Sequence, residues 1–131
     1  MKTALPAVMI LGLVPALARG QVAVEADARG VARVLVGGAE VLKDVGLAVV
    51  RPGWRGDLAN QRTADPAEIS IREDGDATTY VIPLHDPLAG VLIQRIIREK
   101  DGARLEFEVI PDEEAELEAV VVRGSLAAAE N

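Results

Sequence analysis

Residues 91–110 read VLIQRIIREKDGARLEFEVI, and this stretch decides the fold. Apolar and polar side chains alternate on both sides of Asp101-Gly102, as in two half-buried strands joined by a tight turn. Asp-Gly is a preferred two-residue hairpin loop, because both central positions of a type I′ turn need a positive φ. We therefore expect an antiparallel hairpin made of Val91–Arg98 and Arg104–Ile110.

A loop at Asp101-Gly102 also fixes which residues face each other, because each opposite pair in an antiparallel hairpin shares one side of the sheet. The expected pairs are Ile96 with Phe107, Gln94 with Val109, Glu99 with Arg104 and Arg95 with Glu108. Two of these pairs join opposite charges, and a slip of one residue would mix the apolar and polar faces.

The rest of the chain carries the same signals of short strands and tight turns. Two more hairpins are expected, one with Asp74-Gly75 as its loop and Ile69 opposite Tyr80, and one with Gly37-Gly38 as its loop and Val34 opposite Val41. The expected strands outside the first hairpin are 21–25, 31–36, 39–42, 45–50, 68–72, 77–84 and 116–126. About eight or nine short strands with no capped helical segment predict an all-β, antiparallel β-sandwich.

The N-terminal segment has the pattern of an export signal. Lys2 precedes an apolar, uncharged run over residues 4–17, and Ala16-Leu17-Ala18 matches a cleavage site with small residues. We predict a signal peptide over residues 1–18, a single domain over 19–131, and a periplasmic or extracellular location. The alternative for this segment is an N-terminal strand or helix of the domain itself.

Charge and cysteine content exclude several classes of function. The chain has 14 basic and 21 acidic residues and a net charge of -7, so it repels phosphate backbones and anionic lipids. We therefore expect neither a nucleic-acid nor a membrane partner. Without cysteine, the chain has no disulfides, no thiol catalysis and no thiolate metal site. We expect no cofactor.

The longest irregular stretch, Arg51–Pro66, holds the candidate binding residues. It contains the only tryptophan, Trp54, between Arg51 and Arg55, with Arg62 close behind. An indole face can stack on a sugar ring, and a guanidinium can bind its hydroxyl or carboxylate groups. The alternative is that Trp54 folds inward and closes one end of the sandwich.

No catalytic or metal-binding residue is predicted. His85 beside Asp86 would need a partner that the sequence does not indicate, so we interpret it as a loop residue. The acidic runs at 73–76 and 112–118 lack the spacing of calcium loops, and we interpret them as exposed turns.

Two hairpins resemble a known family. Gly37-Gly38 followed by Ala39-Glu40-Val41-Leu42 resembles the start of a galactose mutarotase-like supersandwich, and the hairpin from Gly90–Ile93 to Phe107–Val109 is similar to its middle strands. The resemblance covers residues 31–122 and implies a carbohydrate-active relative. Because such domains are over twice as long and hold their catalytic His and Glu mostly in later strands, no catalytic residue is carried over.

Three functions follow from these observations. The first is an exported, non-catalytic β-sandwich module that binds carbohydrate through Arg51, Trp54, Arg55 and Arg62. The second is the N-terminal portion of a mutarotase-like enzyme. The third is a protein-interaction module that pairs through an edge strand, for which Glu116–Leu126 is the candidate because its centre is apolar on both faces.

Overall fold

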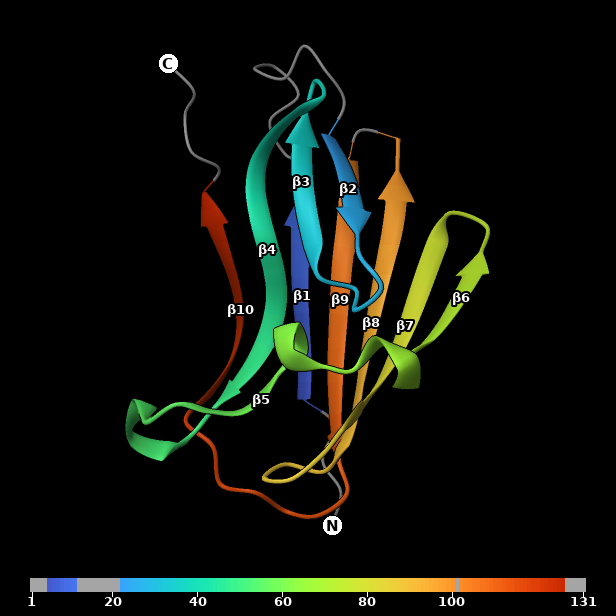
Figure 1. The fold of residues 1–131 in the computed structure, drawn as a ribbon. Helices are drawn as coiled ribbons and strands as arrows, with labels where there is room; N and C mark the ends of the chain where they lie inside the picture. The colour runs from blue at the N-terminus through green and yellow to red at the C-terminus, as the bar shows by residue number, and fades with distance from the viewer. Residues whose placement is uncertain (1–4, 12–21, 101, 127–131) are drawn as a thin grey trace.

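The computed structural model describes residues 5–11, 22–100 and 102–126, and these form an antiparallel β-sandwich, as predicted (Figure 1). The strands are β1 (Leu5–Leu11), β2 (Val22–Ala26), β3 (Ala32–Val36), β4 (Ala39–Val50), β5 (Asp57–Asn60), β6 (Ser70–Asp74), β7 (Ala77–Leu84), β8 (Gly90–Glu99), β9 (Gly102–Pro111) and β10 (Ala119–Leu126). Three short 3-10 turns lie between β4 and β6: η1 (Pro52–Trp54), η2 (Gln61–Thr63) and η3 (Pro66–Glu68).

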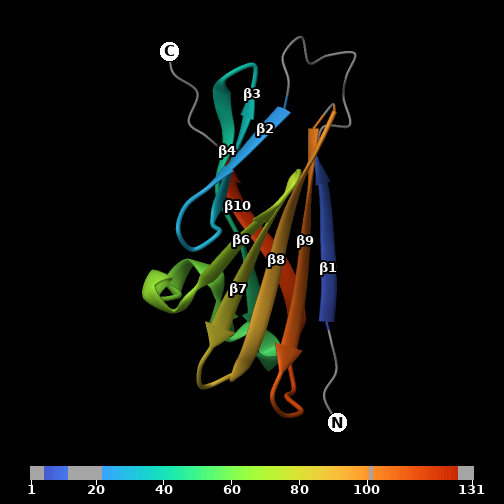
Figure 2. The same cartoon turned by 90° about the vertical axis from the view of Figure 1, so that its right-hand side faces the viewer.

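Two sheets face each other across an aliphatic core (Figure 2). The first has the order β1-β9-β8-β7-β6, and the second has the order β10-β4-β3-β2 with β5 added on β4. Alternate residues of β7, β8 and β9 point inward, as the sequence pattern predicts. The centre of the core includes Leu105, Phe107 and Val109 from β9 and Leu47 and Val49 from β4, all at most 2% exposed.

The hairpin of β8 and β9 forms, but its register differs from the prediction by two positions. Gln94 lies opposite Phe107 and Ile96 opposite Leu105, and the last pair before the turn is Glu99 with Gly102. In the predicted register Arg98 would face Leu105 on the buried side. In the structure Arg98 faces Ala103, and its guanidinium donates to the Thr78 hydroxyl at 3.0 Å. The same shift places Arg95 against Glu106, at 3.3 Å, instead of Glu108.

The β6–β7 hairpin is shifted in the same way. Ile71, not Ile69, lies opposite Tyr80, and the loop is Gly75-Asp76. Gly75 has a φ of 61°, so glycine occupies the first central position of the turn, where a positive φ is required. Because a slip of two residues keeps every side chain on its own face, the predicted inward and outward faces are correct even though the partners are not.

The β3–β4 hairpin contains an irregularity that the sequence did not indicate. Its Gly37-Gly38 turn is as predicted, but a register shift brings Leu42, not Val41, opposite Val34. This places Leu42 against the core and leaves Val41 39% exposed. The two strands expected at 39–42 and 45–50 form one strand, β4, with Asp44 at a φ of 55° between them. Such a local bulge bends the strand without ending it.

Part of the predicted signal peptide is a strand of the sandwich. Residues 5–11 form β1, which pairs with residues 103–109 of β9 at the edge of the first sheet. For these residues the structure shows the alternative considered above, a strand of the domain. Residues 1–4 and 12–18 of the expected signal lie outside the described residues. Cleavage and export stay predictions, since an export signal acts on the chain before it folds.

Within the described part of the chain, no helix has the length and apolarity needed to cross a membrane.

The second sheet contains a gap in its hydrogen-bond ladder, and a glutamine fills it. β4 pairs with β3 up to Val45 and with β5 from Ala48 onward. Between these positions the Leu47 N–H donates to the side-chain oxygen of Gln61, at 3.0 Å. Gln61 is 1% exposed, and its amide nitrogen donates to the Arg29 carbonyl at 2.9 Å and to the side-chain oxygen of Gln94 at 2.5 Å. One amide therefore joins both sheets and the β2–β3 turn.

Gly30 packs directly against this amide pair. Its φ is +76°, and an added Cβ would lie 2.1 Å from the Gln94 oxygen and 2.8 Å from the Gln61 nitrogen. Gly38 has a similar φ of +84°, but nothing lies within 4 Å of its added Cβ. Both glycines therefore have a positive φ that other residues rarely adopt, but only Gly30 lacks room for an added Cβ.

We expect Gly30→Ala to lower the free energy of unfolding by about 2–5 kcal/mol, the sum of left-handed strain and overpacking. Gly38→Ala, which adds the strain alone, should cost about 1–2 kcal/mol. Urea unfolding of the two variants beside the unmodified chain gives both numbers. Equal losses would mean that the amide pair does not need the space at Gly30.

Candidate ligand-binding site

The loop around Trp54 is held in place at several points of its backbone. The Arg51 N–H donates to the Gly56 carbonyl at 2.8 Å, and the Trp54 N–H donates to the Arg51 carbonyl at 3.0 Å. From the segment before β10, the Glu118 carboxylate accepts a hydrogen bond from the Gly53 N–H at 2.8 Å. The loop is therefore closed on itself and anchored to the neighbouring chain segment.

Trp54 is presented to solvent by this loop. Its side chain is 63% exposed, so the alternative in which it closes the end of the sandwich is wrong. Its φ is 59°, a left-handed conformation that costs a non-glycine residue about 1–3 kcal/mol and is enriched at functional sites. The Arg55 side chain lies over Gly53, within 3.5–3.9 Å of where a Cβ would be. An exposed indole and a guanidinium are thus held on one small loop.

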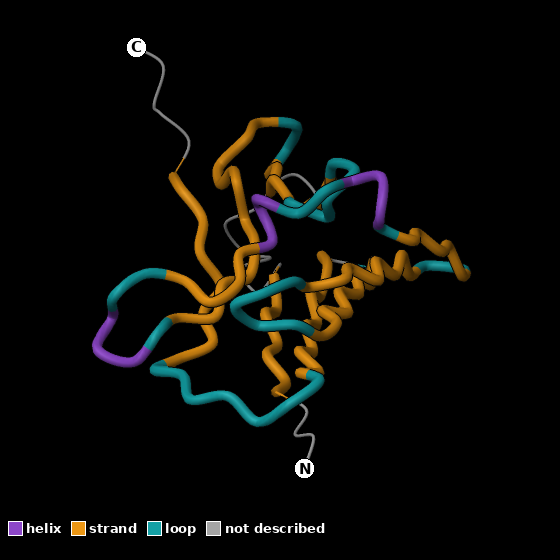
Figure 3. The backbone as a smooth tube through the Cα atoms, turned by 60° about the horizontal axis from the view of Figure 1, so that its bottom comes forward, coloured by secondary structure: helices purple, strands orange, loops and turns teal. Residues whose placement is uncertain are grey.

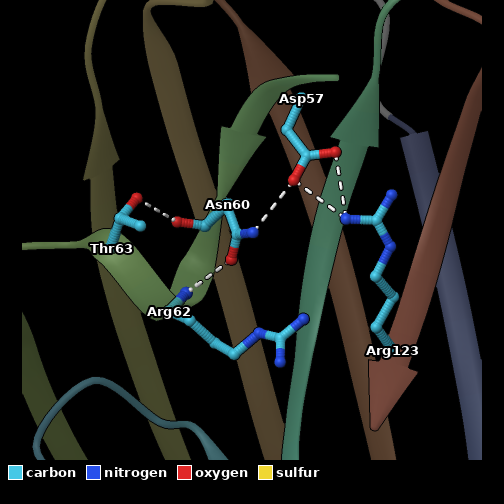
Figure 4. Close-up of polar contacts among 5 residues, drawn as sticks. All are labelled: Asp57, Asn60, Arg62, Thr63 and Arg123. Carbon is cyan, nitrogen blue, oxygen red and sulfur yellow. Dashed lines mark hydrogen bonds and ion pairs between the residues drawn. The ribbon is translucent and has the colours of Figure 1, made fainter. Parts of the chain in front are cut away.

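A second polar cluster surrounds Asp57, at the start of β5 (Figure 4). Its two carboxylate oxygens accept hydrogen bonds from Arg123 of β10 at 3.0 and 2.9 Å, and the Asn60 amide donates to it at 2.9 Å. β5 and β10 lie on opposite sides of β4, so the Asp57–Arg123 ion pair bridges the outer face of β4. It ties the edge strand β10 to β5.

Ionisation of Asp57 is favoured by its partners. Burial of the carboxyl group disfavours the charge, but hydrogen bonds from Arg123 and Asn60 and the positive charges of Arg123 and Arg62 outweigh it. Together they hold the pKa of Asp57 below its ordinary value of 3.8.

Arg62 belongs to this cluster and not to the Trp54 loop. Its N–H donates to the Asn60 side-chain oxygen at 2.9 Å, which caps η2. Its side chain runs beside Gly46 of β4. Figures 1 and 3 show η1 lying apart from η2 and η3. Of the four predicted binding residues, the structure keeps Arg51, Trp54 and Arg55 on one loop and separates Arg62 from them.

A cleft that was not expected from the sequence opens beside this cluster. It has a volume of about 480 Å³ and lies between β5, the segment through η2 and η3, and the β7–β8 loop. In it, the Nε2 atom of His85 lies 2.9 and 3.1 Å from the two carboxylate oxygens of Glu68. The His85 side chain is 68% exposed and that of Glu68 43%, so the pair is largely solvated.

Carboxylates are prominent in the lining of the cleft, and none of its described lining residues is a phenylalanine, tyrosine or tryptophan. Asp65 and Asp86 line it together with Glu68, and the Asp65 carboxylate caps η3 by accepting from the Ala67 N–H at 3.0 Å. Two separate parts of the sequence contribute to this cleft: the long irregular stretch and the loop around His85, which has a proline on each side. The β6–β7 hairpin brings Glu68 beside the His85 loop, and the pairing of β4 with β5 places residues 57–60 next to them.

The described residues contain no group of three or more His, Cys, Asp or Glu side chains that could hold a metal ion. No family model, curated protein or solved structure matches the chain. The resemblance to the mutarotase-like supersandwich therefore stays a prediction, and the function is argued from the chain's own residues.

The Asp57–Arg123 pair predicts an acid-dependent part of the stability. Because the pKa of Asp57 is lower in the folded than in the unfolded chain, its contribution is complete above about pH 4 and is lost as the pH falls further. We expect Asp57→Asn to cost about 1 kcal/mol at pH 7, since Arg123 is partly exposed, and less at pH 3. Urea unfolding at both pH values measures the difference from the unmodified chain.

Asp112→Asn is the matched control, because it removes one exposed carboxylate. It should change stability little at either pH. A loss from Asp57→Asn that is equal at pH 3 and pH 7 would show that the hydrogen-bonded geometry, not the charge of Asp57, stabilises β10.

Proposed function

We propose that this protein is an exported, non-catalytic β-sandwich module that binds carbohydrate at the Trp54 loop. The observation that carries the proposal is the exposure of Trp54 in a strained, left-handed conformation on a loop with an anchored backbone. An aromatic ring that is mostly exposed to solvent on a strained, anchored loop is typical of a ligand-stacking platform.

Arg55 gives the proposed site a preference for acidic sugars. Its side chain lies over Gly53, next to Trp54 in the chain. Stacking of the indole on a sugar ring would leave a carboxylate at the rim of the ring within the range of a guanidinium. The net charge of -7 disfavours anions elsewhere on the surface, so this loop is a local exception.

Trp54 is the only tryptophan, and tryptophan fluorescence, excited selectively over Tyr80, therefore reports on this loop alone. We expect uronic-acid oligosaccharides to shift the emission on titration and neutral oligosaccharides to do so at higher concentration. Trp54→Ala should weaken binding by calorimetry at least about tenfold, which corresponds to about 1.4 kcal/mol of lost stacking.

Two further variants make this test specific. Arg55→Gln should reduce affinity for the acidic oligosaccharides and leave the neutral ones unchanged. Ile71→Ala, which truncates another exposed apolar side chain on β6, should bind like the unmodified protein. Absence of any fluorescence or calorimetric response across both classes of sugar would refute carbohydrate binding at Trp54.

A second candidate function is pairing with another protein through a sheet edge. The position of β10 favours it: β10 pairs with β4 on one side only, and it is the outermost strand of its sheet. Val120 and Val122 pack against the core, so Val121 alternates to the outer face. Val121→Lys would abolish association through β10. If the variant still associates, the contact must use a different edge.

A further inference from the structure

Strand β9 depends on β1 for its outer hydrogen-bond partners. β1 pairs with β9 over seven residues without a break, from Leu5 opposite Val109 to Leu11 opposite Ala103. On its other side β9 pairs continuously with β8. β1 lies within the predicted signal peptide, so the inference below rests on the proposed export with cleavage after Ala18.

Cleavage would turn β9 into a free edge of regular geometry. Natural edge strands are usually blunted by proline, lysine, bulges or very short length. Residues 103–109 read ARLEFEV, and they contain no proline, no lysine and no irregularity in either ladder. Leu105 and Phe107, which are 0% and 2% exposed in the structure, would lie beside the opened edge. Such an edge accepts an added strand through backbone hydrogen bonds.

The side chains on the outer face of β9 complement a second copy of the same strand. Arg104 and Glu106 alternate with the buried residues, and both point away from the core. If two β9 strands pair antiparallel about Leu105, each Arg104 lies opposite Glu106 of the other copy, and the buried residues stay on the inner side. The register thus creates two opposite-charge pairs and places no like charges directly opposite.

Arg104 is also weakly paired within its own chain. Its Nε atom is buried and makes no hydrogen bond in the described structure. The nearest carboxylate oxygens belong to Glu106, at 3.5 Å, and Glu99, at 3.9 Å. A guanidinium held this loosely has hydrogen-bonding capacity left for a facing carboxylate.

We propose that removal of residues 1–18 uncovers β9 as a self-pairing edge, and that the processed protein forms a symmetric dimer by β9–β9 pairing about Leu105. The sheet β9-β8-β7-β6 of each copy then continues into that of the other. The interface is isologous, with the same strand on both sides of a two-fold axis. In the uncleaved chain β1 occupies the edge and prevents this association.

The test compares the sedimentation of three forms over a range of concentrations. The first is the protein exported by its host, with its N-terminus determined by mass spectrometry. The second is the full chain with β1 disabled by Val8→Pro and Met9→Pro, since proline removes ladder donors. The third is the full chain with cleavage blocked by Ala16→Leu and Ala18→Leu. We expect dimers for the first two forms and a monomer for the third.

Charge reversal identifies the edge and the register. In the full chain with β1 disabled, Arg104→Glu or Glu106→Arg alone should weaken the dimer roughly tenfold or more, because like charges then face each other twice. The double variant, Arg104→Glu with Glu106→Arg, should restore it. Arg72→Glu on β6, the same charge change at the opposite edge of the sheet, should have no effect.

The outcomes separate this proposal from the proposed function. An exported protein that keeps Met1 would refute processing, while the form with β1 disabled still decides whether β9 pairs with itself. Monomers of that form at all concentrations, or a dimer that tolerates Arg104→Glu, would overturn self-pairing through β9. A dimer lost on Val121→Lys and kept on Arg104→Glu would instead assign the association to β10.

Discussion

The buried amide of Gln61 is the interaction on which the sandwich depends. β4 exchanges one hydrogen-bond partner, β3, for another, β5, and the exchange leaves the Leu47 N–H without a strand beside it. In a protein interior an unpaired N–H is expensive, so a side chain must replace the missing strand. Gln61 does so and uses its own N–H groups to hold the Arg29 carbonyl and Gln94. Its removal would leave all three groups to find other partners.

A buried pair of amides is not the most stable way to fill this part of the core. Gln94 is 0% exposed, and its amide nitrogen has no hydrogen-bond partner within the described residues. An aliphatic residue there would avoid that cost, but it would leave Gln61 with one acceptor fewer and the two sheets without a directional contact. Aliphatic side chains dominate the remaining core, and their hydrophobic contacts are non-directional. The amide pair instead favours a single alignment of the two sheets, in the way that a lone polar residue fixes the register of a coiled coil.

The difference between local and long-range information explains which features the sequence could predict. Alternation of apolar residues is local, and it correctly predicted the sandwich and the buried faces of β7, β8 and β9. The register of two hairpins was wrong by two positions, because an even slip preserves the faces and only packing at Arg98 and the turn geometry at Gly75 decide between the choices. β5 was missed because four residues inside a long irregular stretch become a strand only through their pairing with β4. The Trp54 loop could be singled out from composition, whereas the separation of Arg62 from it could not.

The N-terminal segment has a composition that suits both an export signal and an edge strand. An export signal needs a short, uncharged apolar run, and an edge strand over an aliphatic core is built from similar residues. The two uses exclude each other in one molecule at one time, because a segment paired along the whole of residues 103–109 is not free to enter a translocation channel. The order of events therefore decides which state is reached. Under the proposed processing, export before folding leaves β9 without β1, whereas folding before export pairs β1 with β9 and makes the proposed signal inaccessible.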